Sequence, residues 1–186
     1  TGNADVRITS QLENGVFNFT SLPTNDTRPM FRVSLNSNQA NSSATASVLQ
    51  YNQIEYDIGN GWDSTNYRYQ PSIPGYYHFM ASFQDIGNVD VIQMLCYVYY
   101  NTSYIHWGRY YWANDQSNDD LYGTSCAVNF VAHFSGDDHV QIRAYAQSED
   151  GLNVTVAGDP GITFFSGYLI QRTNNPRSTR IGAINP

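Results

Sequence analysis

The chain has 186 residues, which is enough for one domain with a sizeable core. Its net charge of −7 and its pI of about 4.7 argue against binding to nucleic acid, which requires a basic surface. The same sign argues against adsorption to anionic membranes, and no stretch approaches the roughly 18 apolar residues of a membrane-spanning helix. We therefore expect neither a nucleic-acid partner nor membrane insertion.

The composition favours an all-β protein with a polar, charge-poor surface. Aromatic residues make up 15% of the chain, tyrosine occurs fifteen times, and no long stretch has the apolar periodicity of a helix. Charged residues make up only 13%, and all nine basic residues are arginine. A surface of Asn, Ser, Thr, Gln and Tyr is typical of contact surfaces that bind through rings and adaptable hydrogen bonds. An ordinary solvated surface in a lineage that avoids lysine is an equally good interpretation.

The first thirty residues predict a small hairpin followed by a linker. Residues 6–13 and 16–20 flank Asn14-Gly15, a strong short-range hairpin signal. Residues 21–30 are polar and contain two prolines. We expect residues 1–30 to form an attachment segment outside the main domain.

The middle of the chain carries a regular spacing of aromatic residues, Asp, Trp and Gly. In residues 75–83, Tyr77, Phe79 and the following alternate residues share one face of a strand, because side chains alternate with period two. Asn60-Gly61 supplies a turn that can adopt positive φ, and Pro74-Gly75 marks a second chain reversal. The spaced residues, called here the core motif, are Tyr51, Asp57, Trp62, Tyr69, Gly75, Tyr77 and Phe79.

The core motif resembles the signature of the globular head domain of complement component one, subunit q, a relative of the tumour-necrosis-factor jelly rolls. The family usually has Phe where Tyr51 and Tyr69 stand, and an aromatic residue where Ala81 stands. Tyrosine keeps the ring but adds a hydroxyl that needs a partner when it is buried. Ala81 leaves a smaller side chain at its core position.

Three further segments extend this resemblance to about residues 30–172. Residues 31–35 resemble the opening strand of the family, residues 135–142 its Gly-Asp turn and next strand, and residues 164–170 its closing strand. The resemblance implies a jelly-roll β-sandwich of about ten antiparallel strands over residues 31–172, working as a homotrimer. Residues 173–186 are a polar C-terminal extension that wraps a neighbour, anchors the module or forms a tail. A weaker likeness links residues 15–24 to structural proteins of aquatic tailed bacteriophages.

The two cysteines fall in two predicted strands. In the resembled jelly roll these strands are neighbours, and some members join them by a disulfide, which implies a Cys96–Cys126 bridge. Two free thiols buried in a core are an equally ordinary outcome. No cluster of Cys or His has the spacing of metal ligands, so we expect no metal site.

Residues 97–122 are the strongest candidate for binding, because rings stand there beside Asn and Asp. Flat ring faces stack on the C–H surfaces of sugars, while amides and carboxylates bond the hydroxyls. Tyr97 and Tyr99 are in strand register, so we expect them in the core or at the centre of a trimer. The candidate ligand-binding residues are Trp107, Tyr111, Trp112, Asn114, Asp115 and Asn118.

Acidic loops raise the question of calcium, which some relatives of the resembled family hold near the trimer apex. Residues 115–120 and the pair Asp137 and Asp138 supply oxygen atoms, but no spaced calcium-loop motif is present. Asp in a turn more often bonds local backbone, so no cofactor is expected.

The sequence argues against an enzyme. The four histidines are scattered, and no Ser or Cys lies in a nucleophile-elbow context. We therefore expect a non-enzymatic trimeric binding head, such as a virion fibre knob or surface decoration, that recognises a cell-surface glycan or protein. The alternatives are a purely structural capping module of a virion or other assembly, and a secreted lectin-like protein of innate immunity. The expected location is the virion or the extracellular space.

Overall fold

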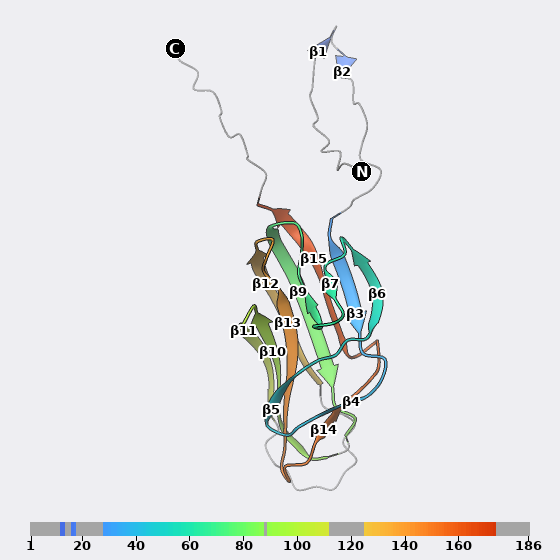
Figure 1. Ribbon diagram of the computed structural model, residues 1–186, viewed down its shortest axis with the longest axis vertical. Helices are drawn as coiled ribbons and strands as arrows, with labels where there is room; N and C mark the ends of the chain where they lie inside the picture. Colours follow the sequence, from blue (N-terminus) through green and yellow to red (C-terminus); the bar gives the residue numbers. More distant parts are fainter. Residues whose placement is uncertain (1–11, 14–15, 18–27, 88, 112–124, 174–186) are drawn as a thin grey trace.

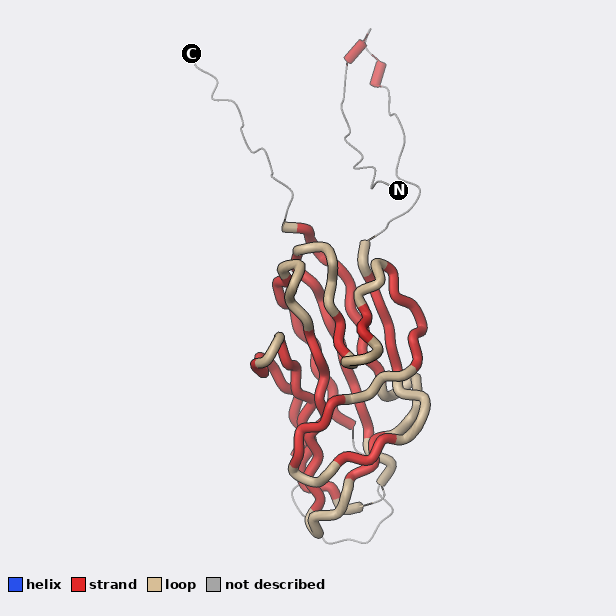
Figure 2. The backbone as a smooth tube through the Cα atoms, viewed as in Figure 1, coloured by secondary structure: helices blue, strands red, loops and turns tan. Residues whose placement is uncertain are grey.

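A computed structural model describes residues 12–13, 16–17, 28–87, 89–111 and 125–173 of the chain. The described residues contain strands, turns and loops but no helix, which confirms the all-β prediction (Figure 2). Two of the short strands, β1 (Leu12–Glu13) and β2 (Val16–Phe17), pair antiparallel on either side of the Asn14-Gly15 signal.

Two antiparallel sheets form the body of the molecule and face each other (Figure 1). The five-stranded sheet has the order β12-β9-β15-β3-β6, and the six-stranded sheet has the order β11-β10-β13-β8-β7 with β5 also paired to β13. A separate pair joins β14 to β4. This arrangement is the predicted jelly-roll sandwich.

The bounds of β3, β9 and β15 lie close to the predicted segments 31–35, 75–83 and 164–170. In the five-stranded sheet the strands are β12 (Ser125–Phe134), β9 (Gly75–Gln84), β15 (Phe164–Arg172), β3 (Met30–Ser34) and β6 (Gln53–Ile58). In the six-stranded sheet they are β11 (Ser103–Tyr111), β10 (Val91–Tyr100), β13 (Val140–Ser148), β8 (Arg68–Tyr69), β7 (Trp62–Asp63) and β5 (Thr45–Val48). The small pair is β14 (Val154–Val156) and β4 (Gln39–Asn41).

The core between the sheets is built from alternate residues of the long strands. In β9 the buried positions are Tyr77, Phe79, Ala81 and Phe83, so the predicted strand face is confirmed. The ring of Phe31 stacks on Tyr69 at a centroid distance of 3.9 Å and meets Phe165 edge-on at 4.9 Å. Each such ring contributes about 1.5–3 kcal/mol to stability through burial alone.

The spacing of the core motif has a local cause at the turn after β6. The carboxylate of Asp57 accepts hydrogen bonds from the backbone N–H groups of Gly61 (3.2 Å) and Trp62 (3.0 Å). Positive φ occurs at Gly59 (107°) and Asn60 (52°), so the turn residues lie one position earlier than Asn60-Gly61. Gly61 is needed for another reason, because a Cβ there would lie 2.5 Å from the ring of Tyr69.

The two hydroxyls that distinguish this chain from the family pattern have different surroundings. The hydroxyl of Tyr51 donates to the carbonyl oxygen of Phe164 over 3.4 Å. The hydroxyl of Tyr69 is buried and makes no hydrogen bond with the described residues. Burial raises the pKa of both phenols, so both stay protonated.

Cys96 on β10 and Cys126 on β12 lie in opposite sheets, and both are buried free thiols in the structure. The Sγ atom of Cys126 lies 3.9 Å from the carbonyl oxygen of Met94. Burial raises the pKa of the Cys96 thiol well above its usual value and that of Cys126 to about 11. Protonated, buried thiols of this kind behave as small core side chains.

Candidate functional site

The outward face of β10 carries tyrosines where the sequence suggested core residues. Met94, Cys96 and Val98 point into the core and are fully buried. The alternate positions belong to the opposite face of the strand, where Tyr97 and Tyr99 are only partly buried and Leu95 is buried. Of the two expected positions of Tyr97 and Tyr99, the core is wrong, because β10 has apolar or aromatic residues on both faces and Met94, Cys96 and Val98 form the inward set. A position at the centre of a trimer stays a prediction.

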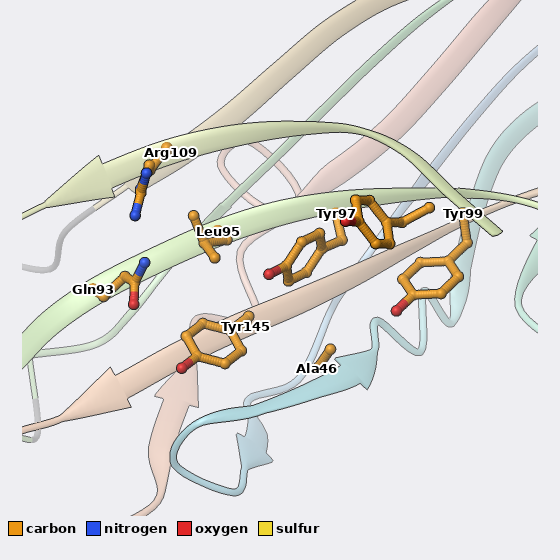
Figure 3. Close-up of a pocket in the computed structure, with 8 residues that line it drawn as sticks. Ala46, Gln93, Leu95, Tyr97, Tyr99, Arg109 and Tyr145 are labelled. Carbon is orange, nitrogen blue, oxygen red and sulfur yellow. The ribbon is translucent and has the colours of Figure 1, made fainter.

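Neighbouring strands bring further side chains to these two tyrosines. The backbone of β11 places Tyr104 opposite Tyr99 and Arg109 opposite Leu95. On the other side, β13 places Tyr145 opposite Leu95. Together they line an open groove of about 520 Å³, called here the tyrosine groove (Figure 3). Its described lining residues are Ala46, Gln93, Leu95, Tyr97, Tyr99, Tyr104, Arg109 and Tyr145.

The four rings of the tyrosine groove support one another edge to face. Tyr97 is at the centre, with centroid distances of 5.9 Å to Tyr104, 6.2 Å to Tyr145 and 6.4 Å to Tyr99. Tilts of 61–86° between these ring planes match the preferred T-shaped contact of aromatic rings. The rings thus hold each other in place while remaining at the surface.

Polar contacts fix two of these rings further. The guanidinium of Arg143 lies 3.9 Å above the ring centre of Tyr99, and its Nε donates to Gln141 over 3.0 Å. The hydroxyl of Tyr145 donates to the side-chain oxygen of Gln147 over 3.3 Å. Such prior ordering lowers the side-chain entropy that the protein loses when a ligand binds.

The hydroxyl of Tyr97 stays protonated at neutral pH. Partial burial is the main factor that raises the pKa of Tyr97, the neighbouring Tyr145, Tyr99 and Tyr104 raise it further, and Arg109 lowers it. The phenol of Tyr97 can therefore both donate and accept a hydrogen bond. The described lining offers rings, hydroxyls, an amide and a guanidinium, and it offers no carboxylate, histidine or cysteine.

The structure describes only some of the predicted binding residues. Trp107 and Tyr111 belong to β11, where their backbones pair with Tyr97 and Gln93. Trp112, Asn114, Asp115 and Asn118 lie outside the described residues. Sequence reasoning missed Arg109 and Tyr145. A sequence signal for Tyr145 was present in β13. Polar residues and Tyr145 alternate there with buried residues, at positions Gln141, Arg143, Tyr145 and Gln147.

A second surface, the outward face of the five-stranded sheet, has a different character. One row of Cα partners crosses this sheet from Ile58 through Met30, Tyr168 and His78 to Val131. Ile58, Tyr168 and Val131 of this row are exposed, and so are Tyr56 and Met80 in the next row. We call these five exposed residues the apolar face.

Few charges interrupt the apolar face. Arg32 forms an ion pair with Glu55 at 2.7 Å and lies 4.1 Å above the ring of Phe164. His78 packs against Tyr168 with ring centroids 5.1 Å apart. The exposed apolar side chains and the paired charges make this face suitable for contact with another protein surface.

The acidic turn between β12 and β13 bonds its own backbone and neighbours. The carboxylate of Asp138 accepts from the N–H of Ser135 (2.8 Å) and from the side chain of Asn101 (2.9 Å). Within the described part of the chain, no group of three His, Cys, Asp or Glu residues could hold a metal ion. No helix among the described residues is long and apolar enough to cross a membrane.

The two facing sheets and their strand order place the chain in the class of jelly-roll sandwiches formed by the complement head and tumour-necrosis-factor proteins. The globular domain of a zebrafish complement 1qA protein is similar, with 16% identity and a TM-score of 0.55 over 78% of this chain and 98% of that one. Murine APRIL is similar at 11% identity and a TM-score of 0.56, over 77% and 99% of the two chains. The Eiger TNF of S. frugiperda is similar at 9% identity and a TM-score of 0.57, over 80% and 96%.

No family model matches the chain, and no curated protein matches it. The structural similarity therefore confirms the resemblance inferred from the core motif at the level of the fold.

Proposed function

We propose that the chain is a non-enzymatic, trimeric binding head that recognises a cell-surface glycan or protein. The tyrosine groove is the binding site, and the apolar face holds the three copies together. The head forms the tip of a virion fibre or another surface decoration. Residues 1–30 and 173–186 attach it to the rest of the assembly.

The observation that carries this proposal is the outward position of the tyrosines. Tyr97, Tyr99, Tyr104 and Tyr145 form a cluster on the surface, although burial of four rings in a core would stabilise the fold more. Rigid rings with hydroxyl tips give a large contact area at a low cost in side-chain entropy. Such a cluster is typical of a recognition surface.

The lining chemistry supports binding over catalysis. The described residues of the groove include no carboxylate, histidine or thiol that would act as a general acid, a general base or a nucleophile. The two thiols of the chain are buried in the core and protonated.

The apolar face supports assembly into a trimer. Exposed Ile58, Tyr168 and Val131 lie on one row across the sheet, and contact with a second copy removes them from water. A stable interface of this kind buries about 2,000 Å² or more. Three equivalent grooves then raise a weak single-site affinity through effective concentration.

The virion setting draws support from the short likeness of residues 15–24 to phage structural proteins. It also draws support from the position of the strand ends, because β3 begins and β15 ends at the same end of the sandwich (Figure 1). Two attachments at one end leave the opposite end and the sheet faces open.

A purely structural module is the second candidate, and the apolar face is the observation that favours it. A trimer held by this face would cap or decorate an assembly without any receptor. A secreted lectin-like protein of innate immunity would use the same groove and the same trimer, and it differs only in its source and location.

The double variant Tyr97→Ala, Tyr145→Ala tests the proposal. Fluorescent wild-type protein should stain cells that carry the ligand, and the variant should lose this staining while light scattering gives the same mass. Tyr67→Asn, which removes a half-buried ring in the turn between β7 and β8, outside both faces, is the control for the loss of a tyrosine, and asparagine tolerates the φ of 51° at this position. Staining that survives in the double variant contradicts recognition through the groove and favours the structural module.

A further inference from the structure

The six-stranded sheet has an unusual charge pattern for so acidic a chain. Strands β5, β10, β11 and β13 contain no Asp or Glu, although the chain has sixteen such residues. The same four strands contain two arginines, Arg109 and Arg143. The acidic residues next to them in the chain are Asp90, before β10, and Glu149, after β13, which lie beyond the strand ends.

Both arginines belong to the outward face that carries the tyrosine groove. Arg109 pairs with Leu95 and lines the groove directly, and Arg143 pairs with Tyr97 and covers the ring of Tyr99. Figure 3 shows Arg109 and Gln93 at one end of the row of rings and Tyr99 at the other. A ligand that lies along the rings therefore meets a guanidinium at the Arg109 end.

The rings and hydroxyls of the groove favour one feature of a ligand, its sugar faces, and the guanidinium favours another, an anionic group. Ring faces favour flat, weakly polar C–H surfaces, and the phenol hydroxyls and the amide of Gln93 favour a ligand with many hydroxyls. A guanidinium bonds carboxylate or sulfate oxygens through parallel N–H donors. Sugars that carry an acidic group combine all of these features.

We infer that the ligand of the tyrosine groove is an acidic saccharide, whose sugar faces stack on Tyr97 and Tyr145 and whose anionic group binds Arg109. This inference rests on the proposed binding function and narrows it. The absence of acidic residues from the four strands serves this role, because a carboxylate on this face would repel the ligand.

The test uses the whole chain and three oligosaccharides of equal length as probes in titration calorimetry. The first is a neutral glucose oligomer, the second carries carboxylates as in oligogalacturonate, and the third carries sulfates as in heparin fragments. We expect an acidic probe to bind about tenfold or more tightly than the neutral one at low salt. The preference should shrink near 1 M salt, where the screening length falls to about 3 Å. The carboxylated and sulfated probes identify which anionic group is preferred.

Arg109→Gln should weaken the acidic probes far more than the neutral probe and so remove the preference for acidic saccharides, and Arg109→Lys should keep part of this preference. Tyr97→Ala should weaken all three probes. Arg172→Gln, which removes one positive charge from the five-stranded sheet, should change nothing.

Equal binding of acidic and neutral probes, or a preference that survives in Arg109→Gln, would overturn the inference. Absence of saccharide binding, combined with cell staining that depends on Tyr97 and Tyr145, would identify a protein ligand and overturn the inference alone. Cell staining that does not depend on these tyrosines is the different result that contradicts the proposed function.

Discussion

The two outward faces of the sandwich rest on one core but differ in almost every property of their side chains. The face of the six-stranded sheet carries Tyr97, Tyr99 and Tyr145 with two arginines, and its rings contact one another. The face of the five-stranded sheet carries exposed aliphatic residues such as Ile58 and Val131, and Arg32 of this sheet is paired with Glu55. Both faces are built by the same alternation of in and out along the strands.

This difference shows that a β-sandwich separates stability from recognition by strand register. The inward residues of β9 and β10 decide whether the sheets pack, and the outward residues are free to vary without cost to the core. In the proposed function, one outward face contacts an identical copy and the other binds the ligand. The following predictions test whether the two faces are independent above a shared core.

The largest effect is expected from Phe79→Ala, which removes a ring that packs on Phe130 (5.1 Å), Phe134 (5.3 Å) and Phe165 (5.8 Å). Large-to-small changes of this kind cost about 3–5 kcal/mol. Urea unfolding should show this loss of stability. Ligand binding by the tyrosine groove and assembly through the apolar face should fall together. Ser82→Ala, on the outward side of the same strand, should stay within about 0.5 kcal/mol of wild type. Loss of ligand binding with full retention of assembly, or the reverse, would contradict a shared core.

The next effect is expected from Val131→Asp, which places a charge on the apolar face at its β12 end. Burial of an unpaired carboxylate between copies is strongly unfavourable, so the protein should become a monomer. Light scattering should show a fall from about three chain masses to one, with the binding of each single groove unchanged. Leu152→Asp makes a similar change at an exposed loop position and should keep the trimer. A trimer that persists in Val131→Asp would place the interface elsewhere.

A smaller, pH-dependent effect is expected from Asp138→Asn in the turn that joins the two sheets. Partial burial raises the pKa of this carboxyl, but hydrogen bonds from Ser135, Tyr100 and Asn101 outweigh it and hold the pKa well below its usual value. The charged form is thus stabilised by folding, and this stability is present above the unfolded pKa of about 3.9 and lost as the pH falls toward the folded value.

Urea midpoints at several pH values should therefore show the largest gap between wild type and Asp138→Asn near neutrality. The gap should narrow as the pH falls below about 4. Asp137→Asn is the control, because it changes the exposed neighbouring carboxyl of the same turn. A gap that widens on acidification would contradict the role given to Asp138.

The smallest effect is expected from removing single hydroxyls of the core. Tyr69→Phe removes a buried hydroxyl that has no partner among the described residues, so the variant should be more stable by up to about 1 kcal/mol. Tyr51→Phe removes a hydroxyl that bonds the carbonyl of Phe164, so it should be neutral or slightly less stable. Neither change should alter ligand binding by the tyrosine groove or assembly through the apolar face. A destabilised Tyr69→Phe would show that its hydroxyl has a partner after all.

The sequence predicted the architecture well because β9 alternates cleanly and the core motif repeats a known spacing. The role of Asp57 also follows locally, since its carboxylate bonds the N–H groups of Gly61 and Trp62 within one turn. Short-range geometry of this kind is contained in the order of residues.

The site was harder to predict for two physical reasons. In β10 both alternating sets are apolar or aromatic, so periodicity could not decide whether Tyr97 and Tyr99 point inward. The groove also needs Arg109 and Tyr145, which lie on two other strands and reach Tyr97 only through the pairing of β10 with β11 and β13. Register between strands depends on the whole sheet and cannot be inferred from one segment.

The start of β3 and the end of β15 lie close together, and this has a consequence for protein engineering. Met30 at the start of β3 is the direct partner of Tyr168 near the end of β15, and the carbonyl of Pro29 accepts from the N–H of Leu169. A short flexible linker should therefore join residues 172 and 29 without disturbing either sheet. New ends opened at Gly151, an exposed glycine with a φ of 77° and open space where a side chain would stand, would give a circular permutant. Such a rearranged chain would present the tyrosine groove and the apolar face on an unchanged scaffold, with its points of fusion moved to the other end.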